Sequence, residues 1–596
     1  MQKRILLKNL VFPISFVLVL LVGMMNGLAV KQAMAAGGSA NWAFNQASKE
    51  SGVPMSILKA LCYMEGHLSN HRGTASRDNG YGCMHLVKNM HGDTLDSAAH
   101  DLGVSEDQLK RDLATNIRGG AAILRDEALQ LASNHLLPAY LADWYGALAA
   151  YSHASTKSVA RMYADEVYRL LEIGFTAMTD TGELVSLPAQ AVQPNVTTAA
   201  GVKTASTLPN GCSNDGKTDY PGAIDCIVPS SFDCNTVTGN NPCTYESANR
   251  PGDLAIDFVT IHDIEGTVQD AFNAFQDINS SVSIHYVVDT DGTVYQLLRE
   301  KDIAYHAGNY WYNQHAIGIE HAGFDATGFL WYNAAEYMGS ARLVAYLLKK
   351  YRLPPDHDHV VGHGTIPSPA AKYRPNHVDP GPYWLWDYYF WLIWQDLAFN
   401  MKWHNNHIIT LHPRTDLLPL GGGGAESPAN FNFFYLYNGP STQSGLIPQV
   451  GSGSDVTDET NNVEPDISYY YLDKVRDPAG TGDMLYEVWY GEADHAHDAT
   501  PSQFANAKLV WLAVPPSAAF MGEGQLVMLN LSGATSAKVY GDPITDDAYQ
   551  IGDASNGAIF VSALTAIEDG TTNLWYEINY NHRQAWVPAT EVTVVP

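Results

Sequence analysis

The feature that most constrains the fold is His262, which stands at the end of the apolar run 258–261. His363 follows a second short apolar run further along the chain, and Asp379 lies just beyond it. Two histidines and a carboxylate at the ends of β-like runs can hold a metal ion and leave one coordination position open. The sequence therefore predicts a metal site of the kind that zinc hydrolases use.

Residues 212–415 alternate predicted strands with predicted helices, an order typical of an α/β domain with a central mixed β-sheet. Asp291-Gly292 between two alternating runs predicts a hairpin turn. Apolar residues that recur at about 3.6 residues predict the helices. The expected strands are 258–262, 284–288, 293–298 and 360–361, and the expected helices are 268–278, 334–351 and 383–397.

The flanking regions have other patterns, so the chain is predicted to be multidomain. Residues 36–178 have the helical period, whereas residues 428–516 and 520–596 are typical of short strands. Each of the two later segments has an alternating strand and then a tryptophan-bearing strand. They resemble bacterial SH3-like modules, which implies two small all-β barrels. Composition predicts two linkers, at 179–211 and at the glycine-rich 416–427.

The first 35 residues, 1–35, have the features of a secretory signal. Basic residues precede an apolar run at 10–30, and Ala33-Met34-Ala35 is a small-x-small cleavage site. Because the apolar run is long for a signal, an uncleaved membrane anchor is the alternative. We therefore expect an exported protein, which would touch a membrane only through an uncleaved N-terminal segment.

The charge of the chain excludes one class of partner. It has 34 basic and 63 acidic residues, a net charge of −29, and loss of residues 1–35 would remove four basic residues and no acidic one, which gives −33. Such a surface repels nucleic acid, so no nucleic-acid partner is expected.

Six cysteines in an exported chain predict disulfides. Cys62 and Cys83 lie apart from the others and can pair with each other. The other four crowd into one loop-rich segment and include no Cys-x-x-Cys, which favours disulfides over a zinc knuckle and leaves their connectivity open. They are Cys212, Cys226, Cys234 and Cys243.

Short motifs follow one another through the central region, and their order is informative. They are Val259-Thr260-Ile261-His262, Ser283-Ile284-His285-Tyr286, Asp291-Gly292-Thr293-Val294, His306-Ala307-Gly308, Ile317-Gly318-Ile319-Glu320, Gly362-His363 and Asp379-Pro380-Gly381-Pro382. In this order they resemble the zinc-dependent N-acetylmuramoyl-L-alanine amidases, the group that includes the peptidoglycan recognition proteins. The resemblance implies an α/β amidase domain in which His262, His363 and Asp379 bind Zn²⁺.

The same resemblance implies catalytic roles for two more residues. Glu320 would take the proton from the metal-bound water and pass it to the leaving amine. His377 stands two residues before Asp379, so in an extended segment both side chains share one face. His377 would then stabilise the oxyanion.

Other polar residues near the motifs have weaker assignments. His306 is expected either to touch substrate at the edge of the cleft or to be structural, and His285 is expected to be structural. Glu265, three residues after His262, is a weaker candidate for a position facing the cleft. His357 and His359 have a spacing that suits metal ligands but are expected to lie in a solvated loop.

Residues 36–178 contain a second series of motifs, at 53–60, 63–66, 79–86, 116–121 and 149–152. Their order resembles the lytic transglycosylase and goose-type lysozyme group, which implies an α-helical lysozyme-like domain. Glu65 would be its general acid, kept protonated by apolar surroundings. His85 stands where glutamine is usual and Ser152 where asparagine is usual. A domain that only holds glycan is the alternative.

Together these patterns predict a secreted, cell-wall-associated peptidoglycan hydrolase. It would cleave the amide bond between N-acetylmuramic acid and L-alanine with zinc-activated water, and bind both the glycan strand and the stem peptide. The N-terminal domain would cleave glycan, as a second glycosidase or lytic transglycosylase activity, or only bind it. The alternative is a non-catalytic peptidoglycan-binding or recognition protein.

Overall fold

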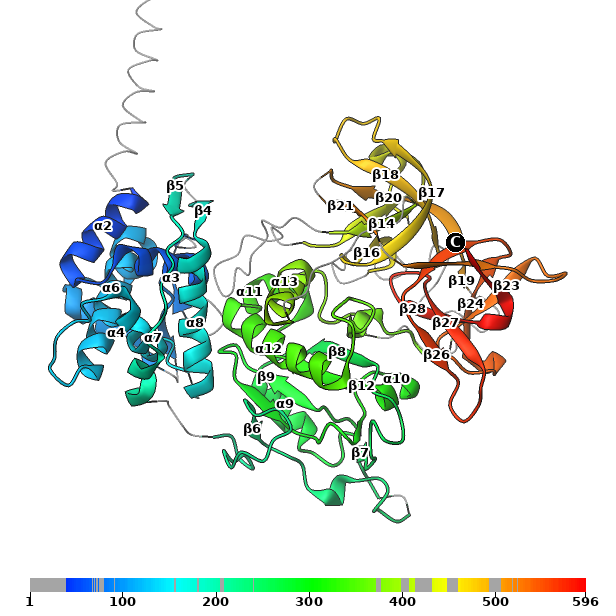
Figure 1. Ribbon diagram of the computed structural model, residues 1–596, viewed down its shortest axis with the longest axis horizontal. Helices are drawn as coiled ribbons and strands as arrows, with labels where there is room; N and C mark the ends of the chain where they lie inside the picture. Colours follow the sequence, from blue (N-terminus) through cyan, green and yellow to red (C-terminus); the bar gives the residue numbers. More distant parts are fainter. Residues whose placement is uncertain are drawn as a thin grey trace, which may run out of the picture.

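The computed structural model has three parts along the chain (Figure 1). Helices form the N-terminal part, a sheet with helices forms the central part, and strands form the C-terminal part. Among the described residues, no helix is long and apolar enough to cross a membrane. The expected signal and the glycine-rich linker lie outside the described residues.

The residues that the structure describes are 39–66, 68, 70, 73, 80–89, 92–154, 157–179, 182–203, 208–239, 241–370, 377–397, 407–412, 431–447, 459–491, 505–516, 518–522 and 524–595.

The N-terminal part is helical, as predicted. Its helix α3 buries Ile57, Leu58 and Leu61 against the neighbouring helices. The disulfide between Cys62 and Cys83 confirms the expected pairing. The helices are α2 (Ala40–Ser51), α3 (Met55–Gly66), α4 (Thr94–Leu102), α5 (Glu106–Arg111), α6 (Leu113–Leu131), α7 (Tyr145–Tyr151) and α8 (Lys157–Ile173).

The structure differs from the linker expected at 179–211. β4 (Phe175–Met178) and β5 (Leu184–Leu187) form an antiparallel hairpin that packs on the N-terminal part. The Glu183 carboxylate accepts hydrogen bonds from two backbone amides at the start of α2, and Lys59 Nζ donates to a β5 carbonyl at 2.8 Å. Four-residue strands are too short to show a period, so the sequence pattern did not distinguish them from a linker.

The central part has a six-stranded mixed sheet, which confirms the predicted α/β class. In sheet order the strands are β13 (Val360–Gly362), β8 (Phe258–Asp263), β12 (Ala316–His321), β9 (Tyr286–Val288), β10 (Val294–Gln296) and β6 (Ile224–Asp225). Strands β13, β8, β12 and β9 are parallel, and β9 and β10 form the predicted hairpin. Gly292 in its turn has a φ of 81°, a conformation that favours glycine.

Two of the predicted central helices are shorter than expected. They are α9 (Val268–Phe275) and α13 (Trp386–Leu397), whereas α12 (Ala334–Tyr351) has the predicted bounds. Side chains alternate between the two faces of the sheet. Ile261 and Ile319 pack in one core with α12 and α13. His262 and Glu320, the next residues on β8 and β12, therefore lie on the opposite face.

Two disulfides lie in the first segment of the central part, residues 212–243. They join Cys212 to Cys226 and Cys234 to Cys243, which settles the connectivity that the sequence left open. The Cys226 amide donates to the Gln296 carbonyl at 2.9 Å, so the first disulfide holds the chain beside β10.

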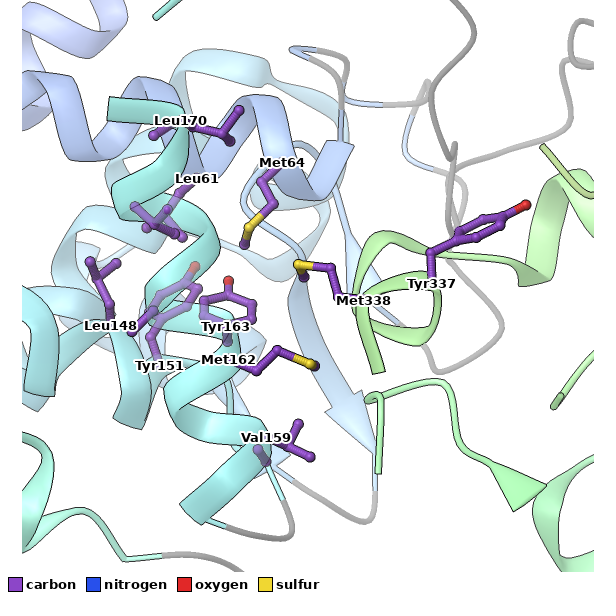
Figure 2. Packing of buried hydrophobic residues seen from close by; sticks show 14 of the residues in the cluster. Leu61, Met64, Leu148, Tyr151, Val159, Met162, Tyr163, Leu170, Tyr337 and Met338 are labelled. Carbon is purple, nitrogen blue, oxygen red and sulfur yellow. The ribbon is translucent and has the colours of Figure 1, made fainter. Parts of the chain in front are cut away.

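The N-terminal and central parts share one hydrophobic core. Figure 2 shows Met64 and Met162 of the N-terminal part on the side of the core where Met338 of α12 approaches. Arg342 of α12 forms a 3.5 Å ion pair with Asp165 of α8 at the same contact. Flexible thioether side chains fill irregular gaps well, so the methionines of the two parts pack against each other at this interface.

The C-terminal strands depart from the boundaries expected for two separate barrels. β14 (Ile408–Leu411), expected in the central domain, pairs with β17 (Ser468–Arg476) and β21 (Ala519–Met521). β19 (Ala505–Asn506), expected in the first module, pairs with β24 (Gln550–Ser555) of the second. All four β14 residues are buried, so the apolar strand fills a position in this sheet. The larger sheets also contain β15 (Phe434–Tyr437), β16 (Asn462–Val463), β18 (Met484–Tyr490), β20 (Lys508–Val514), β23 (Ser536–Tyr540), β26 (Thr565–Ile567), β27 (Leu574–Asn579) and β28 (Gln584–Pro588).

Aromatic side chains join the C-terminal strands to the central part. Trp586 of β28 is fully buried and meets Trp311 edge-to-face, with ring centroids 5.2 Å apart. Its indole nitrogen donates to the Tyr312 hydroxyl at 3.3 Å. This tryptophan therefore belongs to an interdomain core and not to an open groove.

Candidate metal centre

His262 and Glu320 are paired neighbours on the parallel strands β8 and β12. Residues in such a pair direct their side chains to the same face of the sheet. Both side chains are buried, with His262 2% and Glu320 8% exposed. The register of two strands that are far apart in sequence thus places a histidine beside a carboxyl group.

His262, His363 and Asp379 form a compact metal-binding group. His262 Nδ1 lies 3.1 Å from Asp379 Oδ2, and His363 Nδ1 lies 3.2 Å from Asp379 Oδ1. The Gly364 amide donates to the Asp379 carbonyl at 2.9 Å, which fixes the two ligand-bearing segments to each other. The structure thus brings together the three residues that the sequence analysis assigned to zinc.

The chemistry of this donor set fits Zn²⁺. Two imidazoles and one carboxylate are a known three-ligand set for catalytic zinc. Burial lowers the pKa of His262 to about 4, which keeps the ring neutral, the form that binds metal. Among the described residues, the buried Nε2 atom of His363 has no hydrogen-bond partner. Burial alone would raise the pKa of Asp379, but His363 and the other histidines hold it well below its usual range, so the carboxylate stays ionised.

Glu320 is positioned to exchange a proton beside this group. Its Oε2 atom is buried and has no hydrogen-bond partner in the described part of the chain. Burial raises the pKa of Glu320 well above its usual range, and the nearby Asp379 and Asp263 raise it further. A carboxylate with a raised pKa takes up a proton more readily, which is what a general base requires.

His377 lies at the open side of the group. Its side chain is 77% exposed, and its ring stacks on that of His363 with centroids 4.8 Å apart. A hydrogen bond to Asp379 raises the pKa of His377. An exposed imidazole beside buried ligands has access to a bound substrate, whereas the ligands themselves do not face solvent.

Arg583, which follows β27 in the C-terminal part, braces the loops of the metal centre. From its Nη1 atom it donates to the carbonyls of Gly364 at 2.5 Å, Ile366 at 3.0 Å and His377 at 3.0 Å. The side chain is only 5% exposed. No motif in the sequence indicated this residue, because the contact joins segments of different domains.

Replacing Arg583 by alanine is expected to weaken the metal centre. The buried carbonyls of Gly364 and Ile366 and the part-buried carbonyl of His377 would lose this donor, and an unsatisfied buried group costs about 1–3 kcal/mol. The expected result is a lower thermal midpoint together with weaker zinc retention, measured by calorimetry and by metal analysis after dialysis. Arg476→Ala, at an exposed position of β17, is the control. Wild-type zinc retention in the Arg583 variant would contradict the bracing role.

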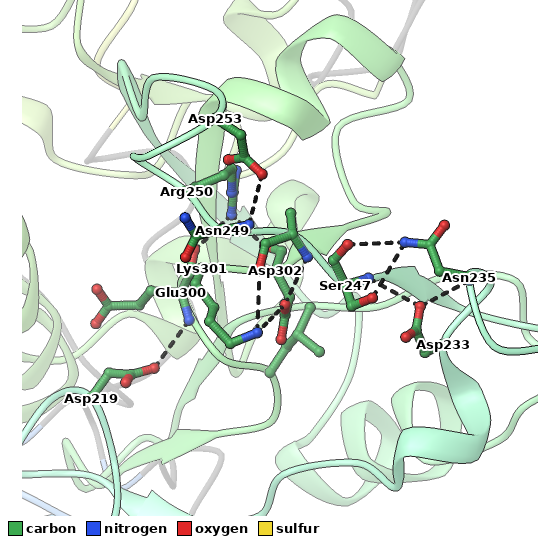
Figure 3. A network of polar contacts seen from close by, with 12 residues as sticks. Asp219, Asp233, Asn235, Ser247, Asn249, Arg250, Asp253, Glu300, Lys301 and Asp302 are labelled. Carbon is green, nitrogen blue, oxygen red and sulfur yellow. Dashed lines mark hydrogen bonds and ion pairs between the residues drawn. The ribbon is translucent and has the colours of Figure 1, made fainter.

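Buried polar side chains lie next to His262 and behind it in the protein interior. His306 Nδ1 lies 3.0 Å from His262 Nε2, which places His306 against a predicted ligand. His285 is fully buried and accepts from the Gly318 amide at 3.1 Å, which confirms its structural role. Arg250 Nη2 contacts the other nitrogen of His285 at 2.9 Å. Figure 3 shows Arg250 beside Glu300, whose carbonyl accepts from the same guanidinium at 2.9 Å.

Three weaker sequence assignments have different outcomes. The expectation of a solvated loop is wrong for His357, which is 1% exposed and lies 3.1 Å from the Glu464 carboxylate. The C-terminal part covers this loop, which a sequence pattern does not reveal. His359 is half-buried beside Asp356. The Glu265 carboxylate accepts from the Asp325 amide at 3.0 Å and is not part of the metal-binding group.

Glu65 lies elsewhere, in a cavity of about 100 Å³ between the N-terminal and central parts. The Tyr163 hydroxyl donates to its carboxylate, and His85 Nδ1 is 3.8 Å away. Thr290 and Asp291, from the turn between β9 and β10, line the same cavity. The central part therefore forms one wall of the space that Glu65 faces.

The central part matches the model of the N-acetylmuramoyl-L-alanine amidase family over residues 252–382. N-acetylmuramoyl-L-alanine amidase A of Achromobacter lyticus is 33% identical over 152 residues, which are 23% of this chain and 81% of that protein. The chain belongs to the N-acetylmuramoyl-L-alanine amidase family. The match to the family model contains the metal-binding group, Glu320 and His377, so the central part is called the amidase domain below.

Two solved structures are also similar to the chain. One is AmiD from E. coli in complex with anhydro-N-acetylmuramic acid-L-Ala-D-gamma-Glu-L-Lys, with 20% identity and a TM-score of 0.21 over 26% of this chain and 62% of that chain. The other is AmpD, with 24% identity and a TM-score of 0.21 over 28% of this chain and 93% of that chain.

Proposed function

We propose that the amidase domain hydrolyses the amide bond between N-acetylmuramic acid and L-alanine in peptidoglycan. The observation that carries the proposal is the complete group of His262, His363 and Asp379 with Glu320 beside it on the neighbouring strand. Two relatives named above are N-acetylmuramoyl-L-alanine amidases, and one of them is bound to a muramyl peptide.

The residues of the site have separate roles in this proposal. His262, His363 and Asp379 would hold Zn²⁺, which when bound acts as a Lewis acid and lowers the pKa of a coordinated water. Glu320 accepts the proton of the attacking water and passes it to the leaving amine of L-alanine. His377 donates to the substrate carbonyl oxygen as negative charge develops there.

Digestion of purified peptidoglycan by the full chain, followed by mass spectrometry, tests the proposal. Stem peptides with a free L-alanine amino group and glycan strands with intact lactyl groups are expected. Binding to peptidoglycan without any such products would support the alternative, a recognition protein that does not cleave its ligand. Products cut within the peptide would instead indicate a peptidase.

The N-terminal domain is proposed to act on the glycan strand, with Glu65 as the general acid. The hydrogen bond from Tyr163 holds the carboxylate, and the buried Val87 and Tyr151 line the same cavity. One carboxyl group is enough if groups of the sugar complete the reaction. A domain that only binds glycan remains the second candidate.

Replacing Glu65 by glutamine is expected to abolish the release of cleaved glycan and to leave amide cleavage unchanged. Glutamine keeps the size of the side chain but has no acidic proton to give, and loss of a general acid costs about 10²–10⁴ in rate. Mass spectrometry separates the two kinds of product. Glu172→Gln, on the exposed side of α8, is the control. If the wild-type chain releases no cleaved glycan at all, the domain is a binder only.

A further inference from the structure

A second cluster of metal-ligand side chains lies where the amidase domain meets the C-terminal sheets. Asp387 is in the first turn of α13, His412 directly follows β14, and Asp466 stands just before β17. Their candidate ligand atoms lie within 4.8 Å of one another. Three separate segments thus converge on one point, and none of the three residues belongs to the metal-binding group of the amidase site.

The distances in this cluster are those of ligands around a shared ion. His412 Nδ1 lies 3.4 Å from Asp387 Oδ1, a long hydrogen bond, and 3.3 Å from Asp466 Oδ1. An N–H···O hydrogen bond is usually about 2.7–3.2 Å long. Ligand atoms at about 2.0–2.1 Å from a tetrahedral Zn²⁺ lie roughly 3.3–3.4 Å from one another.

The burial of Asp466 gives an independent reason for a cation. Its side chain is 7% exposed, and neither carboxylate oxygen accepts a hydrogen bond from the described residues. A buried carboxylate is costly unless a cation neutralises it. Burial raises the pKa of Asp466 to about 7, which reflects the cost of an ionised carboxylate at this position. A divalent ion with neutral His412 would balance both carboxylates in their ionised form.

The surroundings of the cluster also favour a cation. It borders a cavity of about 520 Å³ whose wall contains Asp356 and Asp358 as well. No lysine or arginine is among the described residues that line this cavity. The cavity leaves room for water molecules that would complete the coordination of a metal ion bound by three protein ligands.

We propose that Asp387, His412 and Asp466 bind a divalent cation of the Zn²⁺ type, which joins the amidase domain to the C-terminal sheet. The imidazole nitrogen favours such an ion over Ca²⁺ or Mg²⁺, which prefer oxygen ligands alone. One ligand comes from α13 and two flank strands of the C-terminal sheet, so the ion acts as a clamp between the domains. This inference does not depend on which bond the amidase domain cleaves.

Metal analysis of the full chain tests the inference. The protein is stripped with a chelator, refilled with Zn²⁺ alone, desalted and analysed by plasma mass spectrometry. The wild type is expected to retain two ions per chain, Asp466→Asn one, His363→Ala one, and the double variant none. An Asp466→Asn variant that retains as many ions as the wild type would overturn the proposal. Asp473→Asn, an exposed position on β17, should keep both ions.

Thermal unfolding provides a second measurement in the His363→Ala background, where the proposed clamp is the only one of the two sites left intact. Adding Zn²⁺ should raise the thermal midpoint of this variant, because the ion binds the folded state, and should not raise that of the double variant. An equal rise in both would overturn the proposal. Asp387→Asn gives the same contrast if Asp466→Asn fails to fold. Displacement of the ion by excess Ca²⁺ would contradict the Zn²⁺-type assignment.

Discussion

Glu320→Gln is expected to lower kcat for amide cleavage by about 10²–10⁴-fold without any change in zinc content. Glutamine has nearly the shape of the glutamic acid side chain, but its amide does not accept a proton near neutral pH. Glu320 is not a member of the metal-binding group, so its loss leaves the ligand set intact. The measurement is the rate of release of stem peptides from purified peptidoglycan, with metal content determined on the same samples.

Glu336→Gln is a matched control for this experiment. Glu336 is a fully buried carboxyl group on α12, across the sheet from the metal centre, and burial raises its pKa well above the usual range. Because Glu336 lies on the opposite face of the sheet and glutamine has nearly the same shape, near wild-type activity is expected for this variant. If Glu320→Gln kept an activity within tenfold of the wild type, Glu320 would have no part in the proton transfer.

His363→Ala is expected to lose about one zinc ion per chain and about 1,000-fold or more in amidase activity. A Lewis acid stabilises the transition state by several kcal/mol, and each 1.36 kcal/mol is tenfold in rate. Only His262 and Asp379 would remain as protein ligands at this site. The two variants therefore separate the roles: Glu320→Gln keeps metal and loses turnover, whereas His363→Ala loses both.

His100→Ala serves as the control for His363→Ala, because His100 is 89% exposed and lies in the N-terminal domain. Its zinc content should equal that of the wild type. An unchanged zinc content in His363→Ala would show that His363 is not a ligand, and the assignment of the metal centre would have to be revised.

The sequence carried most of the information about the metal-binding group. His262 and Glu320 end apolar strands, and parallel pairing brings such strand ends together wherever they stand in the chain. The hairpin at Gly292 was also readable, because the turn needs a residue that tolerates a positive φ. Local pattern and tertiary structure agree in this region, and prediction succeeds there for that reason.

The failures occurred where a contact crosses domains. Arg583 and His357 are ordinary polar residues in sequence, and only the docking of the C-terminal part buries them. β14 has the apolar character of any core strand, and nothing local shows which sheet it joins. The local sequence determines whether a strand forms, but the strand with which it pairs depends on packing between distant segments.

Because β14 is a strand of the C-terminal sheet, the amidase domain and the C-terminal part cannot be separated at a domain boundary without breaking that sheet. A truncation designed to isolate the catalytic module would end near residue 412 and would carry away a strand that lies between β17 and β21. The remaining C-terminal fragment would expose two unpaired strand edges, a known cause of aggregation. Conversely, a backbone break engineered between residues 412 and 431 should leave the two pieces associated, as in a split protein whose halves complement each other.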